Sequence, residues 1–313
     1  MAKIDLWQAR RLKLRDFQML EVLAETGSMA AAAEELGLSQ PAISKAMAEM
    51  EHSLKAQLLD RTARGVEVTE SGRVWLERGR VILDEARQGV IDLERLSDPT
   101  KGEVRIGTTE PGAAIVSEIV NSLSRRHPRI KFQIIVSDAS SLRSELRERK
   151  VDVLIAFWSP AAGEDDLNAE ILYKAIYTVA ADHRHPVIRR KQLSLFELTD
   201  ELWAFPPSDS LQRRLVEDLF HRSKLKLPQA TVTTLSYYMM LNLLATGRFL
   251  SALPITMLQH PSNKAWLRAV PIEKVEPAGT VAAITLKKRR MGGAVKLFVD
   301  ESRSVSKHMS WGK

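Results

Sequence analysis

The 313-residue sequence contains no cysteine. Disulfide bonds, thiolate catalysis and cysteine-ligated metals are therefore excluded. No uncharged run reaches the ~18 residues that a membrane-spanning helix needs, and no charged-then-apolar leader opens the chain. We therefore expect a soluble, cytoplasmic protein that does not bind membranes.

Motifs typical of enzymes are also missing. The chain has no G-x-S-x-G, no P-loop G-x-x-x-x-G-K-[ST] and no H-E-x-x-H. His183-Arg184-His185 suggests a metal, but no third ligand is nearby and Pro186 follows, so a polar loop is the better interpretation. We expect no enzyme activity, no catalytic residue, no metal site and no cofactor.

Positive charge is in excess overall, but not in the first part of the chain. The formal net charge is +7. Residues 1–100 hold 14 Lys and Arg against 17 Asp and Glu, whereas residues 101–313 hold 32 against 22. Binding of nucleic acid by the first part must therefore rest on locally placed cations. The excess in the second part favours an anionic ligand or is only solvated surface.

A helix-turn-helix pattern runs over residues 28–54. Consecutive alanines favour a first helix over about residues 29–36, which Gly37 can end with a positive φ. Ser39 is a natural N-cap for a second helix, whose first turn accommodates Pro41. The chain length is enough for this domain and at least one more.

The second helix has two unlike faces. Its apolar residues recur at helical spacing, at Ile43, Met47, Met50 and Leu54. The opposite face is small or polar, as insertion into a DNA major groove requires. The residues expected to contact DNA from this helix are Ser39, Gln40, Pro41, Ser44 and Lys45. From spacing alone, an ordinary helical hairpin with a solvated polar face is the alternative.

A basic turn over residues 60–65 follows, and residues 66–69 alternate like a short strand. Helix, turn, helix and basic hairpin together are typical of a winged helix. Arg61 and Arg64 in the turn would then hold DNA phosphates and set the register without reading sequence.

Residues 26–72 resemble the amino-terminal domain of LysR-type transcriptional regulators. The matching elements are Gly27-Ser28, the alanine pair, Ser39-Gln40-Pro41-Ala42-Ile43-Ser44, Arg61 and Thr69-Glu70-Ser71-Gly72. Two departures are Leu54-Lys55, where the family has Leu-Gly, and Leu58-Leu59, where it has Leu-Phe. The resemblance implies a ligand-responsive transcriptional regulator that binds double-stranded DNA as a dimer or tetramer, with RNA polymerase as a further candidate partner.

Residues 70–96 contain no proline and predict one long helix of about 40 Å. Its apolar stripe comprises Ile82, Ala86, Val90, Leu93 and Leu96. Nothing nearby in sequence could cover this stripe, so a second copy of the helix is the expected partner. A homodimer would place two recognition helices against the half-sites of an inverted repeat. Packing of the helix on its own domain is the alternative.

The chain after residue 102 is predicted to be α/β. Strands and helices alternate, which is typical of a parallel sheet, and the strands over residues 175–181 and 266–272 are among those expected. The predicted organisation is a winged helix-turn-helix DNA-binding domain (14–69), a dimerisation helix (70–96), a hinge (97–102) and an effector-binding domain (103–313) with lobe I at 103–160 and 266–313 and lobe II at 161–265. This two-lobed shape resembles the family's effector domain, which is similar to periplasmic solute-binding proteins.

Ligands in an open α/β sheet bind beyond the carboxyl ends of strands. We therefore expect a small-molecule effector of unknown identity between the lobes, contacted by Thr108, Thr109, Glu110, Ser137, Ser140, Trp158, Pro207 and Ser208. The threonines and free backbone N–H groups suit an anion. Glu110 could instead repel a carboxylate or bind a cationic or hydroxylated ligand. An ordinary helix cap or loop is the alternative at each place.

Overall fold

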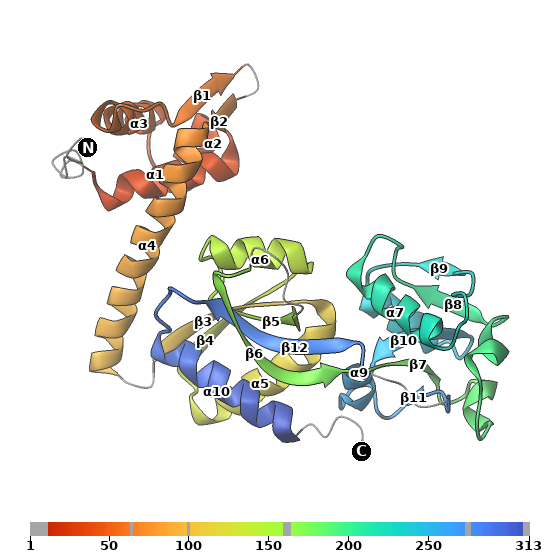
Figure 1. The fold of residues 1–313 in the computed structure, drawn as a ribbon. Coiled ribbons are helices and arrows are strands. Elements are labelled where there is room, and N and C mark those ends of the chain that lie inside the picture. The colour runs from red at the N-terminus through yellow and green to blue at the C-terminus, as the bar shows by residue number, and fades with distance from the viewer. Residues whose placement is uncertain (1–11, 63–64, 99–100, 159–163, 273–276, 309–313) are drawn as a thin grey trace. The chain divides into compact units, whose positions relative to one another are not determined.

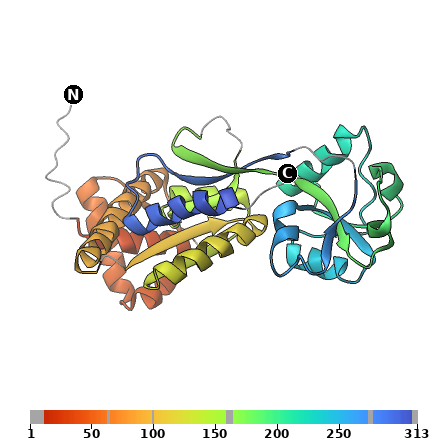
Figure 2. The same ribbon diagram turned by 90° about the horizontal axis from the view of Figure 1, so that it is seen from below.

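The computed structural model describes residues 12–62, 65–98, 101–158, 164–272 and 277–308, without the side chains of residues 95–97 and 308. The chain divides into two compact units, residues 1–99 and 100–313, which are described separately (Figures 1 and 2). No helix in the described residues is long and apolar enough to cross a membrane.

The first unit is helical with a two-stranded hairpin, in the predicted order. Its elements are α1 (Leu14–Thr26), α2 (Met29–Leu36), α3 (Gln40–Leu54), β1 (Leu59–Thr62), β2 (Gly65–Val68) and α4 (Glu70–Ser97). The predicted stripe of α3 is buried at Ile43, Met47 and Met50, in one core with residues of α1, α2 and α4. Burial of this stripe leaves the opposite face of α3 on the outside.

The ends of these helices are set by short-range bonds. The Ser39 side chain accepts from the N–H of Ala42 at the start of α3, as predicted. Gly37 closes α2 with φ 63°, and Lys55 closes α3 with φ 52°. Lys55 therefore adopts the left-handed conformation that glycine usually takes at this place.

Two close approaches of backbone explain why glycines flank the hairpin. Gly65 has φ 133°, and a Cβ there would lie 2.4 Å from the carbonyl oxygen of Gly27. A Cβ on Gly72, in the first turn of α4, would lie 2.1 Å from the carbonyl oxygen of Leu58. Glycine is thus required where the hairpin meets α1 and where α4 meets the residues before β1.

The hairpin is longer than the sequence suggested. Asp60 and Arg61 were expected in a turn, but they lie in β1 and pair with Glu67 and Val66 of β2. The first unit therefore presents Arg61 from a strand rather than from a loop.

The described residues of the second unit form two five-stranded sheets. The first sheet has the order β4-β3-β5-β12-β6, and its strands are β3 (Gly102–Thr108), β4 (Ile130–Val136), β5 (Val153–Trp158), β6 (Leu167–Ala175) and β12 (Gly279–Leu286). β3 is parallel to β4 and β5, whereas β12 is antiparallel to β5 and β6. The sheet is therefore mixed, and the expectation of a parallel sheet holds for three of its strands.

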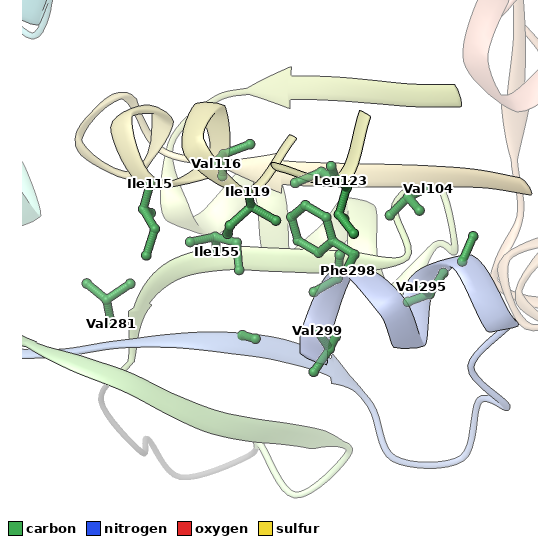
Figure 3. Packing of buried hydrophobic residues seen from close by; sticks show 14 of the residues in the cluster. Val104, Ile115, Val116, Ile119, Leu123, Ile155, Val281, Val295, Phe298 and Val299 are labelled. Atoms are coloured by element: carbon green, nitrogen blue, oxygen red, sulfur yellow. The ribbon is translucent and has the colours of Figure 1, made fainter. Parts of the chain in front are cut away.

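Helices cover both faces of the first sheet. α5 (Ala113–Arg126) and α10 (Gly293–His308) share one face and α6 (Ala139–Arg147) lies on the other (Figures 1 and 2). Phe298 of α10 is fully buried between α5 and the strands, beside Ile119 and Leu123 (Figure 3). Asp152, the residue before β5, is buried. Its carboxylate accepts from Arg105 of β3 at 2.8 Å and from Arg289 at 2.6 Å.

The second sheet has the order β11-β7-β10-β8-β9. Its strands are β7 (Tyr177–Asp182), β8 (Leu202–Phe205), β9 (Val232–Thr233), β10 (Phe249–Pro254) and β11 (Leu267–Ala269). The buried residues of one face pack with α7 (Leu211–Arg222) and the short 3-10 helices at Pro186–Arg189 and Leu195–Leu198. Those of the other face pack with α8 (Tyr237–Leu244) and α9 (Ile255–Gln259).

The boundaries of the lobes differ from those predicted. β6 was assigned to lobe II, but it pairs along its length with β12 in the first sheet. β11 was assigned to lobe I, but it pairs with β7 in the second sheet. The apolar run over residues 175–181, expected to be one strand, is divided at Ile176 between the two sheets. Pairing partners decide these assignments, and a run of apolar residues does not reveal them.

Candidate functional site

The outer face of α3 carries the side chains expected to meet DNA. Ser39, Gln40, Pro41 and Lys45 are exposed, whereas Ser44 is half-buried. Lys45 lies 4.0 Å from Glu49 one turn later, an exposed pair that binds weakly in water. No bulky apolar side chain interrupts this part of the helix, so a duplex can approach it.

Ser44 is hydrogen-bonded to Arg61 of the hairpin. The Nη2 atom of Arg61 donates to the Ser44 Oγ atom at 2.8 Å. Sequence reasoning treated Arg61 as a phosphate contact of the wing, and it did not anticipate this link. Arg64, the other expected wing contact, lies outside the described residues.

The connection from α3 to the hairpin is held by Glu51. Its Oε1 atom accepts from the N–H groups of Leu58 at 2.7 Å and Leu59 at 3.0 Å. Thr69 donates to the carbonyl of Gln57 at 2.7 Å while it caps α4. These bonds fix the hairpin against α3, so that Arg61 and the outer face of α3 keep one geometry.

A cavity of about 810 Å³ lies between the two sheets of the second unit. Four of the residues predicted to contact an effector line it, namely Thr109, Glu110, Ser137 and Ser140. They come from the carboxyl ends of β3 and β4, as the argument from strand ends requires.

Four other predicted residues are not on its wall. Thr108 is fully buried and donates to the Ile155 carbonyl at 2.8 Å, which joins β3 to β5. Trp158 packs on the α6 side of the first sheet, and its neighbour Phe157 lines the cavity instead. Pro207 and Ser208 also lie outside it, because the turn after β8 delivers the following residues to the wall. Those residues include Asp209, Ser210, Gln212 and Arg214.

Three tyrosines that sequence reasoning missed form part of the wall. Tyr173 is on β6, Tyr177 on β7 and Tyr237 on α8, and all three are buried. The hydroxyls of Tyr177 and Tyr237 lie 3.5 Å apart. Burial raises the pKa of Tyr177 to about 12, so the phenol stays neutral and can donate or accept. No motif marks these residues, since a tyrosine in an apolar strand or helix is usually a core residue.

Two carboxylates of the wall are already bound to helix N-termini. Asp138 accepts from the N–H groups of Ser140 at 2.9 Å and Ser141 at 3.0 Å at the start of α6. Bonds from the Ser140 and Ser141 hydroxyls, with these N–H groups, hold the pKa of Asp138 far below its ordinary value. Across the cavity, Glu110 Oε2 accepts from the N–H of Tyr237 at 2.5 Å, at the start of α8.

Thr256 lines the cavity, but its hydroxyl is shielded from it and is unbonded. Its side chain lines the cavity from α9, is 3% exposed, and its Oγ1 atom has no hydrogen-bond partner in the described structure. The residue follows β10, which is parallel to β8, so the rule of strand ends could have found it.

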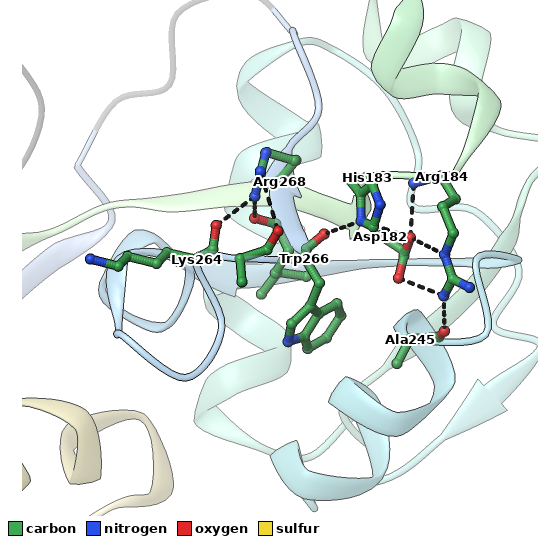
Figure 4. Close-up of polar contacts among 9 residues, drawn as sticks. Asp182, His183, Arg184, Ala245, Lys264, Trp266 and Arg268 are labelled. Carbon is green, nitrogen blue, oxygen red and sulfur yellow. Dashed lines mark hydrogen bonds and ion pairs between the residues drawn. The ribbon is translucent and has the colours of Figure 1, made fainter.

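The far end of α8 is also fixed (Figure 4). Arg184 donates to the carbonyl of Ala245 at 2.6 Å and to both oxygens of Asp182. The Arg184 bond holds the pKa of Asp182 at about 2. His185, next in the chain, is buried and accepts from the N–H of Val187. The His183-Arg184-His185 run thus holds a loop, and no metal-binding cluster occurs among the described residues.

Comparisons with known proteins identify the family of both units. Residues 14–73 match the family described as bacterial regulatory helix-turn-helix protein, lysR family, and residues 97–307 match the LysR substrate binding domain. The HTH-type transcriptional regulator GbpR of Azospirillum brasilense is 30% identical over 275 residues, which cover 86% of this chain and 80% of GbpR.

Solved structures share the fold. A full-length OxyR variant from Pseudomonas aeruginosa gives a TM-score of 0.70 at 19% identity, over 97% of this chain and 99% of that one. The structure of full-length CbnR with its target DNA gives a TM-score of 0.54 at 21% identity, over 94% and 100%. The lysR family and GbpR are described as transcriptional regulators and not as enzymes. With its helix-turn-helix and its substrate binding domain, the chain belongs to the LysR family of DNA-binding transcriptional regulators.

Proposed function

We propose that the protein binds inverted-repeat operator sites as a homodimer and that a small molecule in the cavity modulates transcription. The observation that carries the DNA-binding part is the exposed polar face of α3, with Gln40, Ser44 and Lys45 beside Arg61. Gln40 suits an adenine edge and Lys45 a guanine or a phosphate. Arg61 contacts phosphates while it holds Ser44 in place.

The exposed stripe on α4 supports pairing of two chains. Ile82, Val90 and Leu93 are exposed, with Leu93 66% accessible, although they recur at helical spacing. Exposed apolar residues in such a row on a long helix favour a second helix as their cover. Two copies of α3 would then meet two half-sites. Two such dimers would form a tetramer, and the bound regulator would contact RNA polymerase at the promoter.

The cavity supports the regulatory part of the proposal. Its wall takes residues from both sheets of the second unit, so a ligand that contacts both favours one arrangement of the lobes. The contacts between Glu110 and Tyr237 and between Ser117 and His260 already join the lobes. A ligand that shifts these contacts changes how the dimers pair on DNA.

Footprinting on the DNA that flanks the protein's own gene tests this proposal. A site-specific regulator protects a defined stretch, and candidate ligands alter its extent. Ser44→Ala with Lys45→Ala should abolish the footprint while the far-ultraviolet spectrum is unchanged. Glu34→Gln, an exposed change on α2, is the control. Equal protection of scrambled duplex would contradict the proposal.

A further inference from the structure

The positive charge of the second unit gathers at one end of its first sheet. β3, β4, β5 and β6 begin at this end and β12 ends there, because β3 is parallel to β4 and β5, whereas β12 is antiparallel to β5 and β6. We call the segments at this end the basic edge, which comprises residues 101–103, 125–131, 147–152, 164–167 and 286–292. They hold 12 Lys and Arg against six Asp and Glu, whereas residues 101–313 as a whole hold 32 against 22. More than half of the excess charge therefore lies at this end of one sheet.

Hydrogen bonds and strand pairing hold these segments side by side. The Arg289 guanidinium donates to the carbonyl of Val151 at 2.9 Å. The Lys287 N–H donates to the carbonyl of Asp166 at 2.9 Å. The first residues of β3 and β4 are partners in the ladder. Segments that are far apart in the sequence thus form one surface.

Most carboxylates of the basic edge are already paired within the second unit. Those that lie within salt-bridge distance of an arginine or lysine are Glu148, Asp152, Glu164 and Asp166. Several cations, by contrast, are exposed, and their side chains make no hydrogen bond or ion pair with the described residues, namely Lys101, Arg125, Lys131, Lys288 and Arg290. These cations leave the edge with positive charge that the protein itself does not neutralise.

An extended polyanion fits this surface. The unpaired cations come from the segments beside β4, β3 and β12, and β4 and β12 are about 14 Å apart at three strand spacings. That length of duplex DNA carries about eight phosphate charges. A protein partner would require an apolar centre, but of the large apolar side chains described at the basic edge only Met291 is exposed.

Two further observations favour duplex DNA as the polyanion. The first unit carries the helix-turn-helix, yet residues 1–100 hold more acidic than basic residues, so attraction to DNA there rests on a few local cations. The chain also enters the second unit at the basic edge, since β3 begins at Gly102, shortly after α4 ends at Ser97. A contact made by a tethered unit is intramolecular once DNA is bound, so even weak phosphate contacts add to the affinity.

We propose that the basic edge is a second DNA contact, which binds phosphates and reads no sequence. It is separate from the effector cavity. β4 runs from Ile130 at the edge to Val136 on the cavity wall, a rise of about 20 Å. This inference goes beyond the proposed function, which assigns all DNA contacts to the first unit.

Lys288→Gln with Arg290→Gln tests the inference in the full chain, on a duplex that contains the operator and its flanking DNA. Loss of one or two phosphate contacts should flatten the slope of log affinity against log salt by about one to two and weaken binding about 5- to 30-fold at about 0.15 M salt. Operator and scrambled duplex should lose affinity equally, because phosphate contacts carry no sequence information.

The matched control is Lys191→Gln with Lys226→Gln. It removes the same charge from exposed positions of the second lobe, whose side chains also make no hydrogen bond or ion pair with the described residues. The control should bind DNA with the affinity and salt slope of the wild type. All three proteins should melt at the same temperature, because surface substitutions of this kind have small effects on stability.

An unchanged salt slope in Lys288→Gln with Arg290→Gln would overturn the inference, and so would an equal loss of affinity in the control. If DNA binding is unchanged but transcription by purified RNA polymerase falls, the basic edge meets an acidic protein surface and the inference also fails. A wild-type chain that protects no defined site would contradict the proposed function instead, while the salt slopes would still decide the role of the basic edge.

Discussion

Arg61 of β1 donates to the Oγ atom of Ser44 on α3, at 2.8 Å. The bond joins the first strand of the wing to the second turn of the helix that is expected to read bases. A contact to the DNA backbone through Arg61 and a contact to a base through Ser44 are therefore not independent.

Single and double substitutions measure this dependence. Ser44→Ala and Arg61→Ala should each weaken operator binding by about 1–3 kcal/mol. The double variant should lose less than the sum, because either single change already breaks the shared bond. Binding isotherms on operator and scrambled DNA give the binding free energies of the wild type, the two single variants and the double variant. Additive losses would mean that the bond plays no part in the complex.

Gly72 and Gly89 of α4 should respond oppositely to alanine. A Cβ on Gly72 would clash with the Leu58 carbonyl, whereas nothing lies within 4 Å of one on Gly89. We expect Gly72→Ala to destabilise the first unit by about 1–3 kcal/mol through forced backbone shifts. Gly89→Ala should stabilise it by roughly 0.5–1 kcal/mol. Thermal unfolding checks both, and equal melting temperatures would contradict the close approach.

Asp152 should make the second unit sensitive to acid. Burial would raise its pKa, but the bonds of Arg105 and the charge of Arg289 outweigh burial and lower it. A lowered carboxyl pKa contributes stability above the ordinary value, and the contribution is lost as the pH falls through the folded-state pKa. Asp152→Asn should therefore cost about 3–5 kcal/mol at neutral pH and flatten the loss of stability in acid.

The control for Asp152 is Asp166. Its pair with Arg147 is exposed, so Asp166→Asn should cost at most about 1 kcal/mol. Denaturant unfolding from neutral to acid pH gives both profiles. Parallel pH profiles for the wild type and Asp152→Asn would show that the buried carboxylate is not responsible.

Acidic substitutions in the apolar stripe of α4 should prevent the chain from forming a dimer. Val90→Glu with Leu93→Glu should shift the full chain from dimer to monomer, because two carboxylates would be buried between the helices. Ser71→Glu, in the first turn of the same helix, should leave the mass unchanged. Sedimentation equilibrium measures the masses. A dimer that persists would assign pairing to another surface.

Local signals predicted the first unit well. Ser39, Gly37 and the stripe of α3 each act within one or two turns, so the sequence alone locates α2 and the start of α3 closely. The link between Arg61 and Ser44 could not be predicted, since the two residues are 17 positions apart and meet only when the hairpin folds back.

Long-range pairing limited the prediction of the second unit. β6 was not found because it alternates weakly, and its position depends on β12, more than 100 residues later. The strand-end rule located Thr109, Glu110, Ser137 and Ser140 on the cavity wall but misplaced Thr108, whose hydroxyl faces β5. Which side chain at a strand end points outward depends on twist and on neighbours that the sequence does not reveal.

The hydrogen bond from the Tyr237 N–H to Glu110 can report the separation of the two lobes. One amide proton in the second lobe is shielded by a carboxylate of the first. If the lobes separate, this proton meets water and exchanges, while the amide of Met239, bonded to Ser236 within its own lobe, keeps its protection. The ratio of the two exchange rates would therefore report how often the domain opens, before any ligand is known.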